Sequence, residues 1–124
     1  MSTPRQIAEA FSGHRFRDAY PALAPDVRWT GVGAWTVVGR QAVMDTCEGT
    51  LADLSTTTTD FLRFVVIADG DAVAVDAVGR YVDGAGATSL VASADIYEFR
   101  DGLVAMITSY TVELEPEADP SERS

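Results

Sequence analysis

Apolar residues in the first part of the chain recur every three or four positions, the spacing of one helix face. This spacing predicts a helix that starts at Pro4 and a second helical segment from about Arg15 that Pro21 ends early or bends. It also predicts a longer helix from about Arg40 to Leu54. The long helix should bury Val43, Met44, Cys47, Leu51 and Leu54.

The segment between these helices has a different pattern. Pro25 and Asp26 should turn the chain, and Val27 and Trp29 should begin a short strand. A loop with glycines at positions 31, 33 and 39 should follow. This segment therefore adds one strand to the helical first half.

Beyond residue 55 the chain is rich in β-branched and aromatic residues, which favour strands. Short turn sequences with Asp and Gly divide it, the clearest being Asp69-Gly70-Asp71. The pattern predicts four hairpin-linked strands, at 61–68, 72–82, 90–99 and 103–114.

Helices followed by an antiparallel meander predict an α+β fold. We expect one domain, residues 1–114, in which helices cover one face of a curved sheet and leave a pocket between the two layers. Residues 115–124 are acidic, contain two prolines and should form a solvated tail.

The charge and composition of the chain argue against several classes of partner and cofactor. A formal charge of −10 disfavours nucleic acid and anionic membrane surfaces. The N-terminus lacks the features of a signal peptide and no apolar run could span a bilayer, so we expect a cytoplasmic protein. One cysteine and one histidine exclude an internal disulfide and argue against a metal cluster. We expect no metal and no cofactor, because no cofactor-binding motif is present.

Two stretches resemble a known family. Residues 94–104, with Ser109 and Tyr110 after them, resemble the last two strands of SnoaL-like polyketide cyclases and ketosteroid isomerases. The stretch from Asp26 to Trp29, continuing through Gly39 to Ala42, looks like the strand, loop and helix start that open the same fold. The resemblance covers about residues 3–114. It implies the cone-shaped, mostly antiparallel sheet of the nuclear transport factor 2-like superfamily, which encloses one apolar pocket.

The resemblance also implies a role for Asp95. It matches the aspartate with which the isomerases donate to a developing enolate and which the cyclases use as acid or base. The position of the isomerases' general base is Gly31, and that of their helix tyrosine is Ile7. Ordinary ketosteroid isomerisation is therefore not expected.

The limonene epoxide hydrolases of the same superfamily are matched no better. Their last-strand carboxylate position is Ser109 here, and Asp76 and Arg80 lie four residues apart on one strand. These two residues could form a salt bridge or reach across a subunit boundary.

Strand alternation predicts which side chains accompany Asp95, because every second residue shares a face. We expect Asp95 and Tyr97 to be catalytic. The predicted ligand-binding residues are Trp29, Trp35, Ser93, Phe99, Ile107, Ser109 and Thr111.

Asp95 could act in either protonation state. Desolvation in the pocket would favour the protonated form, which could donate to an enolate oxygen, whereas the ionised form could take a proton beside a carbonyl. Alternatively, Asp95 could be structural, bonded to Ser93, Tyr97 or the backbone. His14 follows a glycine in the turn between the first helices and is expected to be solvated, the alternative being a catalytic base.

These observations predict a cofactor-free isomerase or cyclase that moves a proton on an apolar carbonyl compound. The alternatives are a protein that binds an apolar ligand without changing it and a dimerisation module. A homodimer through the apolar sheet face is expected in each case.

Overall fold

The computed structural model describes residues 2–117, which form three α-helices, one short 3₁₀ helix and a six-stranded sheet. The helical elements are α1 (Pro4–Ser12), α2 (Phe16–Ala19), the short 3₁₀ helix η1 (Tyr20–Ala22) and α3 (Arg40–Asp53). The strands are β1 (Leu23–Gly31), β2 (Trp35–Val38), β3 (Thr58–Asp69), β4 (Ala72–Val82), β5 (Thr88–Arg100) and β6 (Leu103–Leu114).

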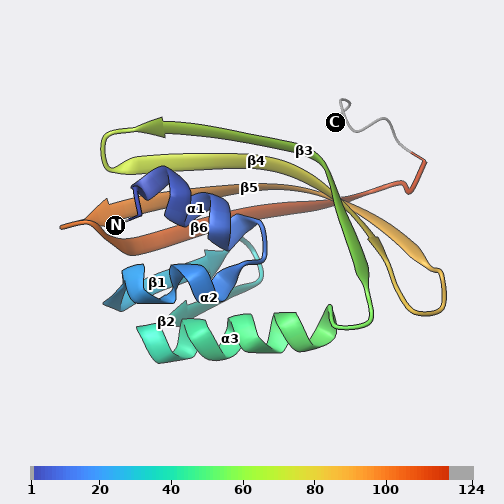
Figure 1. Ribbon diagram of the computed structural model, residues 1–124, viewed down its shortest axis with the longest axis horizontal. Helices are drawn as coiled ribbons and strands as arrows, with labels where there is room; N and C mark the ends of the chain where they lie inside the picture. Colours follow the sequence, from blue (N-terminus) through green and yellow to red (C-terminus); the bar gives the residue numbers. More distant parts are fainter. Residues whose placement is uncertain (1, 118–124) are drawn as a thin grey trace.

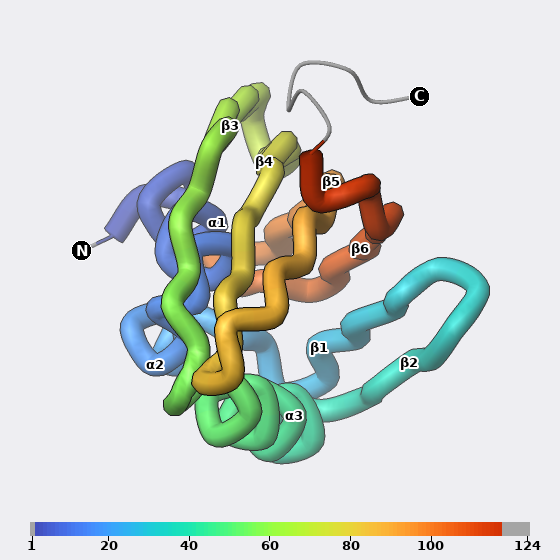
Figure 2. Tube along the Cα trace, turned by 90° about the vertical axis from the view of Figure 1, so that its right-hand side faces the viewer, coloured from blue at the N-terminus to red at the C-terminus, as the bar shows by residue number. Residues whose placement is uncertain are grey.

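The strands follow the order β2-β1-β6-β5-β4-β3. All neighbours pair antiparallel except β1 and β6, which are parallel. The four long strands bend strongly and curl around the helices, with α1 on the concave face and α3 below it (Figures 1 and 2). The predicted α+β architecture, a curved and mostly antiparallel sheet packed on N-terminal helices, is confirmed.

The first helix begins where the sequence predicted. The Thr3 hydroxyl accepts a hydrogen bond from the Gln6 N–H, and the Gln6 side chain accepts one from the Thr3 N–H, which makes a capping box. Pro4 occupies the first turn, where its missing N–H costs nothing. The apolar face of α1, including Ile7 and Phe11, is buried against the sheet.

Pro21 ends the second helix early, which is one of the two outcomes that the sequence predicted. The α-helix stops at Ala19, and η1 leads directly into β1. The predicted turn at Pro25 and Asp26 is wrong, because both residues lie within β1. They fall between Leu23 and Arg28, where the pairing with β6 shifts register, and such irregular strand positions tolerate proline.

The predicted loop between positions 31 and 39 contains a strand that the sequence analysis missed. Trp35–Val38 forms β2, which pairs antiparallel with Arg28–Gly31 of β1. Gly33, at φ +80°, turns the chain between them. The many glycines suggested a loop, but the β-branched residues between them complete the edge of the sheet.

The long helix α3 matches its prediction to within one residue. Val43 and Cys47 are fully buried, while Met44, Leu51 and Leu54 are only partly buried. The Arg40 guanidinium donates two hydrogen bonds, of 2.9 and 2.7 Å, to the Leu23 carbonyl oxygen. These bonds tie the start of α3 to the irregular start of β1.

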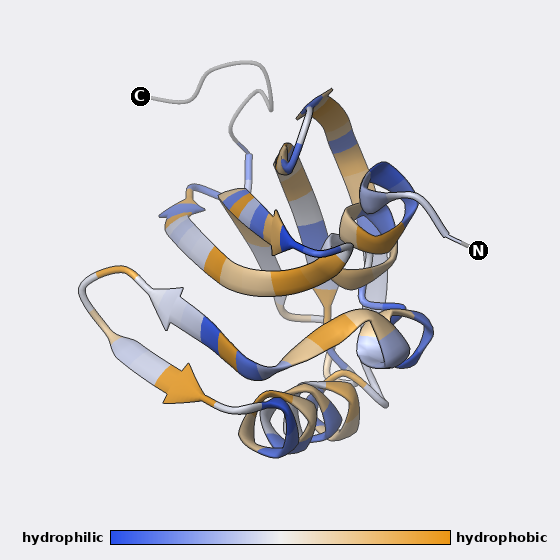
Figure 3. Ribbon diagram, turned by 90° about the vertical axis from the view of Figure 1, so that its left-hand side faces the viewer, coloured by the Kyte–Doolittle hydropathy of each residue, from blue (hydrophilic) through white to orange (hydrophobic). Residues whose placement is uncertain are grey.

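The outer face of the sheet is not covered by any other part of the described chain. Hydrophobic and hydrophilic residues alternate along the strands (Figure 3). The inward residues form the core, and the outward ones include exposed apolar side chains at Val65, Ile67, Ile96, Met106, Tyr110 and Val112.

The sequence also led to predictions about membrane-spanning segments and about the acidic tail. None of the helices within residues 2–117 is both long enough and apolar enough to cross a membrane. The predicted acidic tail falls mostly outside the described residues, which end at 117.

Candidate functional site

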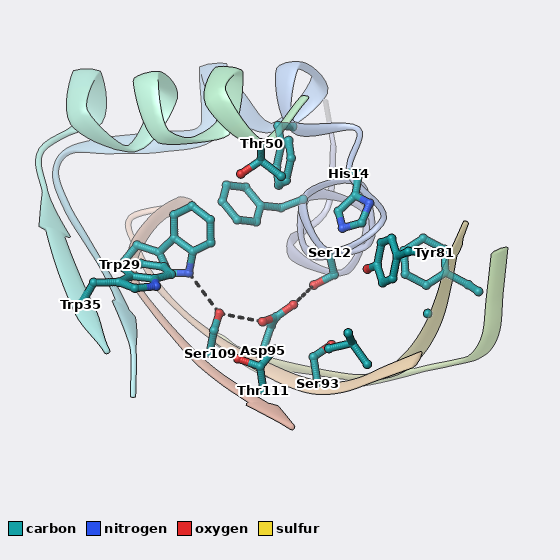
Figure 4. A pocket seen from close by; sticks show the side chains of 15 residues that line it. Ser12, His14, Trp29, Trp35, Thr50, Tyr81, Ser93, Asp95, Ser109 and Thr111 are labelled. Carbon is teal, nitrogen blue, oxygen red and sulfur yellow. Dashed lines mark hydrogen bonds between the residues drawn. The ribbon is translucent and has the colours of Figure 1, made fainter. Parts of the chain in front are cut away.

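A cavity of about 230 Å³ opens between the helices and the concave face of the sheet (Figure 4). A water molecule takes up about 30 Å³ in the liquid, so this space equals roughly eight waters. Its walls come from the α1–α2 region, β1, β2, α3 and strands β3–β6. The lining residues are Phe11, Ser12, His14, Phe16, Trp29, Trp35, Thr50, Phe61, Gly79, Tyr81, Val91, Ser93, Asp95, Ser109 and Thr111.

Asp95 lies in the wall of this cavity, opposite Ser109 in the β5–β6 pairing. Its carboxylate accepts two short hydrogen bonds. The Ser12 hydroxyl donates to Oδ2 at 2.7 Å, and the Ser109 hydroxyl donates to Oδ1 at 2.6 Å. The carboxylate therefore joins the last residue of α1 to the last strand of the sheet.

Each serine in turn contacts a large aromatic donor. Trp29 Nε1 donates to Ser109 Oγ at 3.0 Å, and Tyr97 Oη lies 2.6 Å from Ser12 Oγ. An indole N–H can only donate, so the proton of Ser109 is free to point at Asp95. If Ser12 donates to Asp95, the Tyr97 hydroxyl must donate to Ser12.

The arrangement of donors and acceptors around Asp95 fits an ionised carboxylate. With the carboxylate accepting from both serines, every donor in the network has an acceptor. The network therefore favours the carboxylate over the carboxylic acid.

The structure places six of the predicted site residues in the cavity wall and three outside it. Those in the wall are Trp29, Trp35, Ser93, Asp95, Ser109 and Thr111. Tyr97 lies behind Ser12, and burial raises its pKa well above the ordinary value. Phe99 and Ile107 pack in the hydrophobic core.

His14 does not fit the prediction of a solvated loop histidine. Its ring lies 5.4 Å from Phe61, 5.6 Å from Phe16 and 6.0 Å from Tyr81, centre to centre. Burial lowers its pKa below the usual 6.5, and the nearby Asp95 charge opposes that shift more weakly. His14 is thus a largely neutral group in the cavity wall.

Other wall residues were also missed by sequence reasoning. Ser12 and His14 stand at the end of a helix, and nothing in their local spacing reveals that β5 crosses there. Tyr81 gave a usable signal, because it shares a strand face with Val75 and Ala77. Asp76, on the opposite face, pairs with Arg63 at 3.1 Å.

Two tryptophans close one side of the cavity. The rings of Trp29 and Trp35 meet edge to face, with centres 4.8 Å apart. Trp35 covers Gly31 so closely that a Cβ at position 31 would lie 2.5 Å from the ring atom Cε2. The position at which the resemblance places the isomerases' general base is therefore filled by an indole ring.

The chain matches the SnoaL-like domain family over residues 5–107. No curated protein matches it.

Several solved structures share the fold. An NTF2-like protein of unknown function from Cytophaga hutchinsonii is 27% identical with a TM-score of 0.75, and the match covers 86% of this chain and 93% of that one. A candidate polyketide cyclase from Xanthomonas campestris is 23% identical, with a TM-score of 0.67 and coverage of 87% and 92%. A limonene epoxide hydrolase-like epoxide hydrolase from M. tuberculosis is 20% identical, with a TM-score of 0.63 and coverage of 88% and 82%.

Replacing Gly31 with alanine should displace Trp35. We expect Gly31→Ala to change the near-ultraviolet circular dichroism of the tryptophan pair, because the new methyl group occupies the space of the indole. The free energy of unfolding should change by no more than about 1 kcal/mol, since the exposed Trp35 ring can move. Gly49→Ala is the control, because a Cβ added at position 49 would meet no other group within 4 Å outside its own helix turn. It should leave this signal intact. An unchanged spectrum for Gly31→Ala would contradict the close packing.

The partly buried imidazole of His14 should also make stability depend on pH. A depressed pKa means that the unfolded chain binds a proton at His14 before the folded chain does, so stability falls as the pH drops below about 6.5. Urea unfolding at pH 7.5 and pH 5 should show a smaller loss for His14→Asn than for the unmodified protein. Equal losses would rule out His14 as a source of the effect.

Proposed function

We propose that this chain, which belongs to the SnoaL-like domain family of the nuclear transport factor 2-like superfamily, is a cofactor-free enzyme. It moves a proton on a compact, apolar carbonyl compound. The observation that carries the proposal is the Asp95 carboxylate, which is held by Ser12 and Ser109 in the wall of an aromatic cavity.

The network leaves Asp95 able to react. A carboxylate has about four lone-pair positions, and the two serines occupy one on each oxygen. The remaining positions accept no hydrogen bond from residues 2–117, and Asp95 lines the cavity. An ionised carboxylate held in place by two donors is suited to take a proton from a carbon beside a carbonyl group.

The cavity limits what can bind. Its volume is below the 300–1,000 Å³ common for drug-sized ligands, which favours a substrate of about one ring. Aromatic side chains form most of its apolar wall, and none of its lining residues is arginine. These properties favour a small neutral compound over an anion.

The proposed reaction depends on Asp95, because the two positions at which the ketosteroid isomerases carry their general base and their tyrosine have no reactive side chain here. Gly31 has no side chain, and Ile7 is buried in the hydrophobic core. The machinery that the resemblance implies for ketosteroid isomerases is therefore incomplete. A single proton acceptor still suffices to form an enolate when a donor stabilises its oxygen.

Proton exchange offers a test that does not require the natural substrate. In D₂O the protein should speed the exchange of the protons beside the carbonyl of cyclohexanone or 2-cyclohexenone, followed by proton NMR. We expect Asp95→Asn to lower the protein-dependent rate at least about 100-fold, because an amide cannot accept that proton.

Asp76→Asn is the matched control, because it makes the same change on the outer face and should retain the rate. Circular dichroism must show that both variants fold. Ketones that raise the melting temperature without any exchange would support the alternative, a protein that binds an apolar ligand unchanged. Equal rates for Asp95→Asn and the unmodified protein would exclude Asp95 as the base.

We also propose that two copies of this chain pair through the outer sheet face. Ile67 and Val112 are 64% and 57% exposed there, a large exposure for such residues on one face. Val112 also lines a hollow that includes Ala92, Ala94 and Tyr110. Exposed apolar side chains and a hollow on the same sheet face allow the self-complementary contact of a twofold dimer.

Light scattering after gel filtration tests the dimer. We expect the unmodified protein to have about twice the mass of the chain and Val112→Glu to shift it toward the monomer, because a charge would be buried at the interface. Val32→Glu makes the same change in the β1–β2 turn, where the side chain is also exposed, and should leave the mass unchanged. A monomeric unmodified protein would refute the proposal.

A further inference from the structure

The imidazole of His14 is a polar group in the cavity without a hydrogen-bond partner among residues 2–117. It projects into the cavity next to Ser12, the residue that donates to Asp95 (Figure 4). A polar group left unpaired in a partly buried wall is available to a ligand. The Tyr81 hydroxyl, the Trp35 indole N–H and the hydroxyls of Ser93 and Thr111 in this wall also have no hydrogen-bond partner among residues 2–117.

The backbone holds His14 firmly in this position. The turn after α1 is closed by hydrogen bonds from the N–H groups of Gly13, His14 and Arg15 to carbonyl groups of α1. His14 itself has a φ of +65°, a left-handed conformation that histidine adopts more readily than most residues. Phe16 and Phe61 flank the ring, so the imidazole points into the cavity rather than into solvent.

The protonation state also fits a donor role. Burial keeps the imidazole largely neutral at pH 7, although the Asp95 charge acts in the opposite direction. The other titratable neighbour is Tyr81, whose pKa is raised by burial and by Asp95, so it adds no charge. A neutral imidazole always carries one N–H, and it would not neutralise the Asp95 carboxylate as an imidazolium ion would.

We propose that His14 donates a hydrogen bond to the carbonyl oxygen of the substrate while Asp95 takes the proton from the adjacent carbon. This assignment rests on the proposed function, and it supplies the second group that the reaction needs. It also defines the substrate further, as a neutral ketone or aldehyde whose oxygen and acidic C–H face these two residues.

The step balances without any other reactant. The C–H bond breaks, its proton binds to the Asp95 carboxylate, and its electron pair forms a carbon–carbon double bond. The electrons of the carbonyl double bond move to oxygen, where the enolate accepts the hydrogen bond from His14. Return of the proton to the same or another carbon restores the carboxylate and completes an exchange or an isomerisation.

Two substitutions separate the donor from its packing role. Asn tolerates the left-handed conformation but is too short to reach the place of the ring nitrogens, so His14→Asn should lower the ketone exchange rate about 100-fold. Gln is longer and keeps an N–H donor, so His14→Gln should recover a large part of that loss. Arg15→Gln alters the same turn outside this cavity and should retain the full rate.

Tyr81 provides the competing explanation. Its phenol lies against Gly79, where a Cβ would come within 2.9 Å of the hydroxyl oxygen, and it also faces the cavity. If Tyr81→Phe removes the exchange activity while His14→Asn retains it, the donor is Tyr81 and our assignment is wrong.

A second measurement does not depend on catalysis. His14 is the only histidine in the chain, so its two ring nitrogens give unambiguous ¹⁵N NMR signals. Titration with cyclohexanone should shift the protonated ring nitrogen in the unmodified protein and also in Asp95→Asn, which cannot take the proton. A shift without exchange would refute the proposed function and retain the donor. Exchange that requires Asp95 but neither shifts this nitrogen nor responds to His14→Asn would refute the donor alone.

Discussion

The carboxylate of Asp95 joins the end of α1 to the sheet by polar contacts. Ser12 reaches it from the end of α1 and Ser109 from β6, and each serine is backed by a buried or half-buried aromatic donor. A buried charge is costly unless donors surround it, and here the two layers supply one donor each. The same contacts therefore hold the end of α1 on the sheet and place a charge in the cavity wall. The turn that carries His14 is positioned by the same contact.

The remaining wall depends on pairs of glycine and aromatic residues. Trp35 lies over Gly31 on the first hairpin, and Tyr81 lies over Gly79 on β4. In each pair the absence of a Cβ lets a ring lie flat against the strand, and the ring narrows the cavity. Small aromatic walls of this kind reject large or charged ligands, which is consistent with a compact neutral substrate. The same fold can thus hold different ligands by changes at only a few such positions.

The family relationship determines the scaffold but not the chemistry. Structures that share this fold include a candidate polyketide cyclase and an epoxide hydrolase, at 23% and 20% identity. Here the position of the isomerases' base is occupied by the Trp35 ring over Gly31, and the α1–α2 turn brings His14 into the cavity wall. An assignment of function from the fold alone would therefore name groups that this chain does not have.

The sequence alone determined the order of all the main elements except β2, the fold class and the position of Asp95 on an inward strand face, because period-two and helical patterns report directly which side of an element is buried. It did not reveal β2 or the continuation of β1 through Pro25, since both depend on pairing with distant strands. It also predicted that Phe99 and Ile107 line the ligand site, whereas both pack in the hydrophobic core. Alternation shows which face of a strand a residue is on, but it does not show which part of that face the helices cover. His14 shows the limit most clearly. Its neighbours in sequence are polar, whereas its neighbours in space are Phe61, Tyr81 and Asp95, which only the folding of the sheet around α1 brings together.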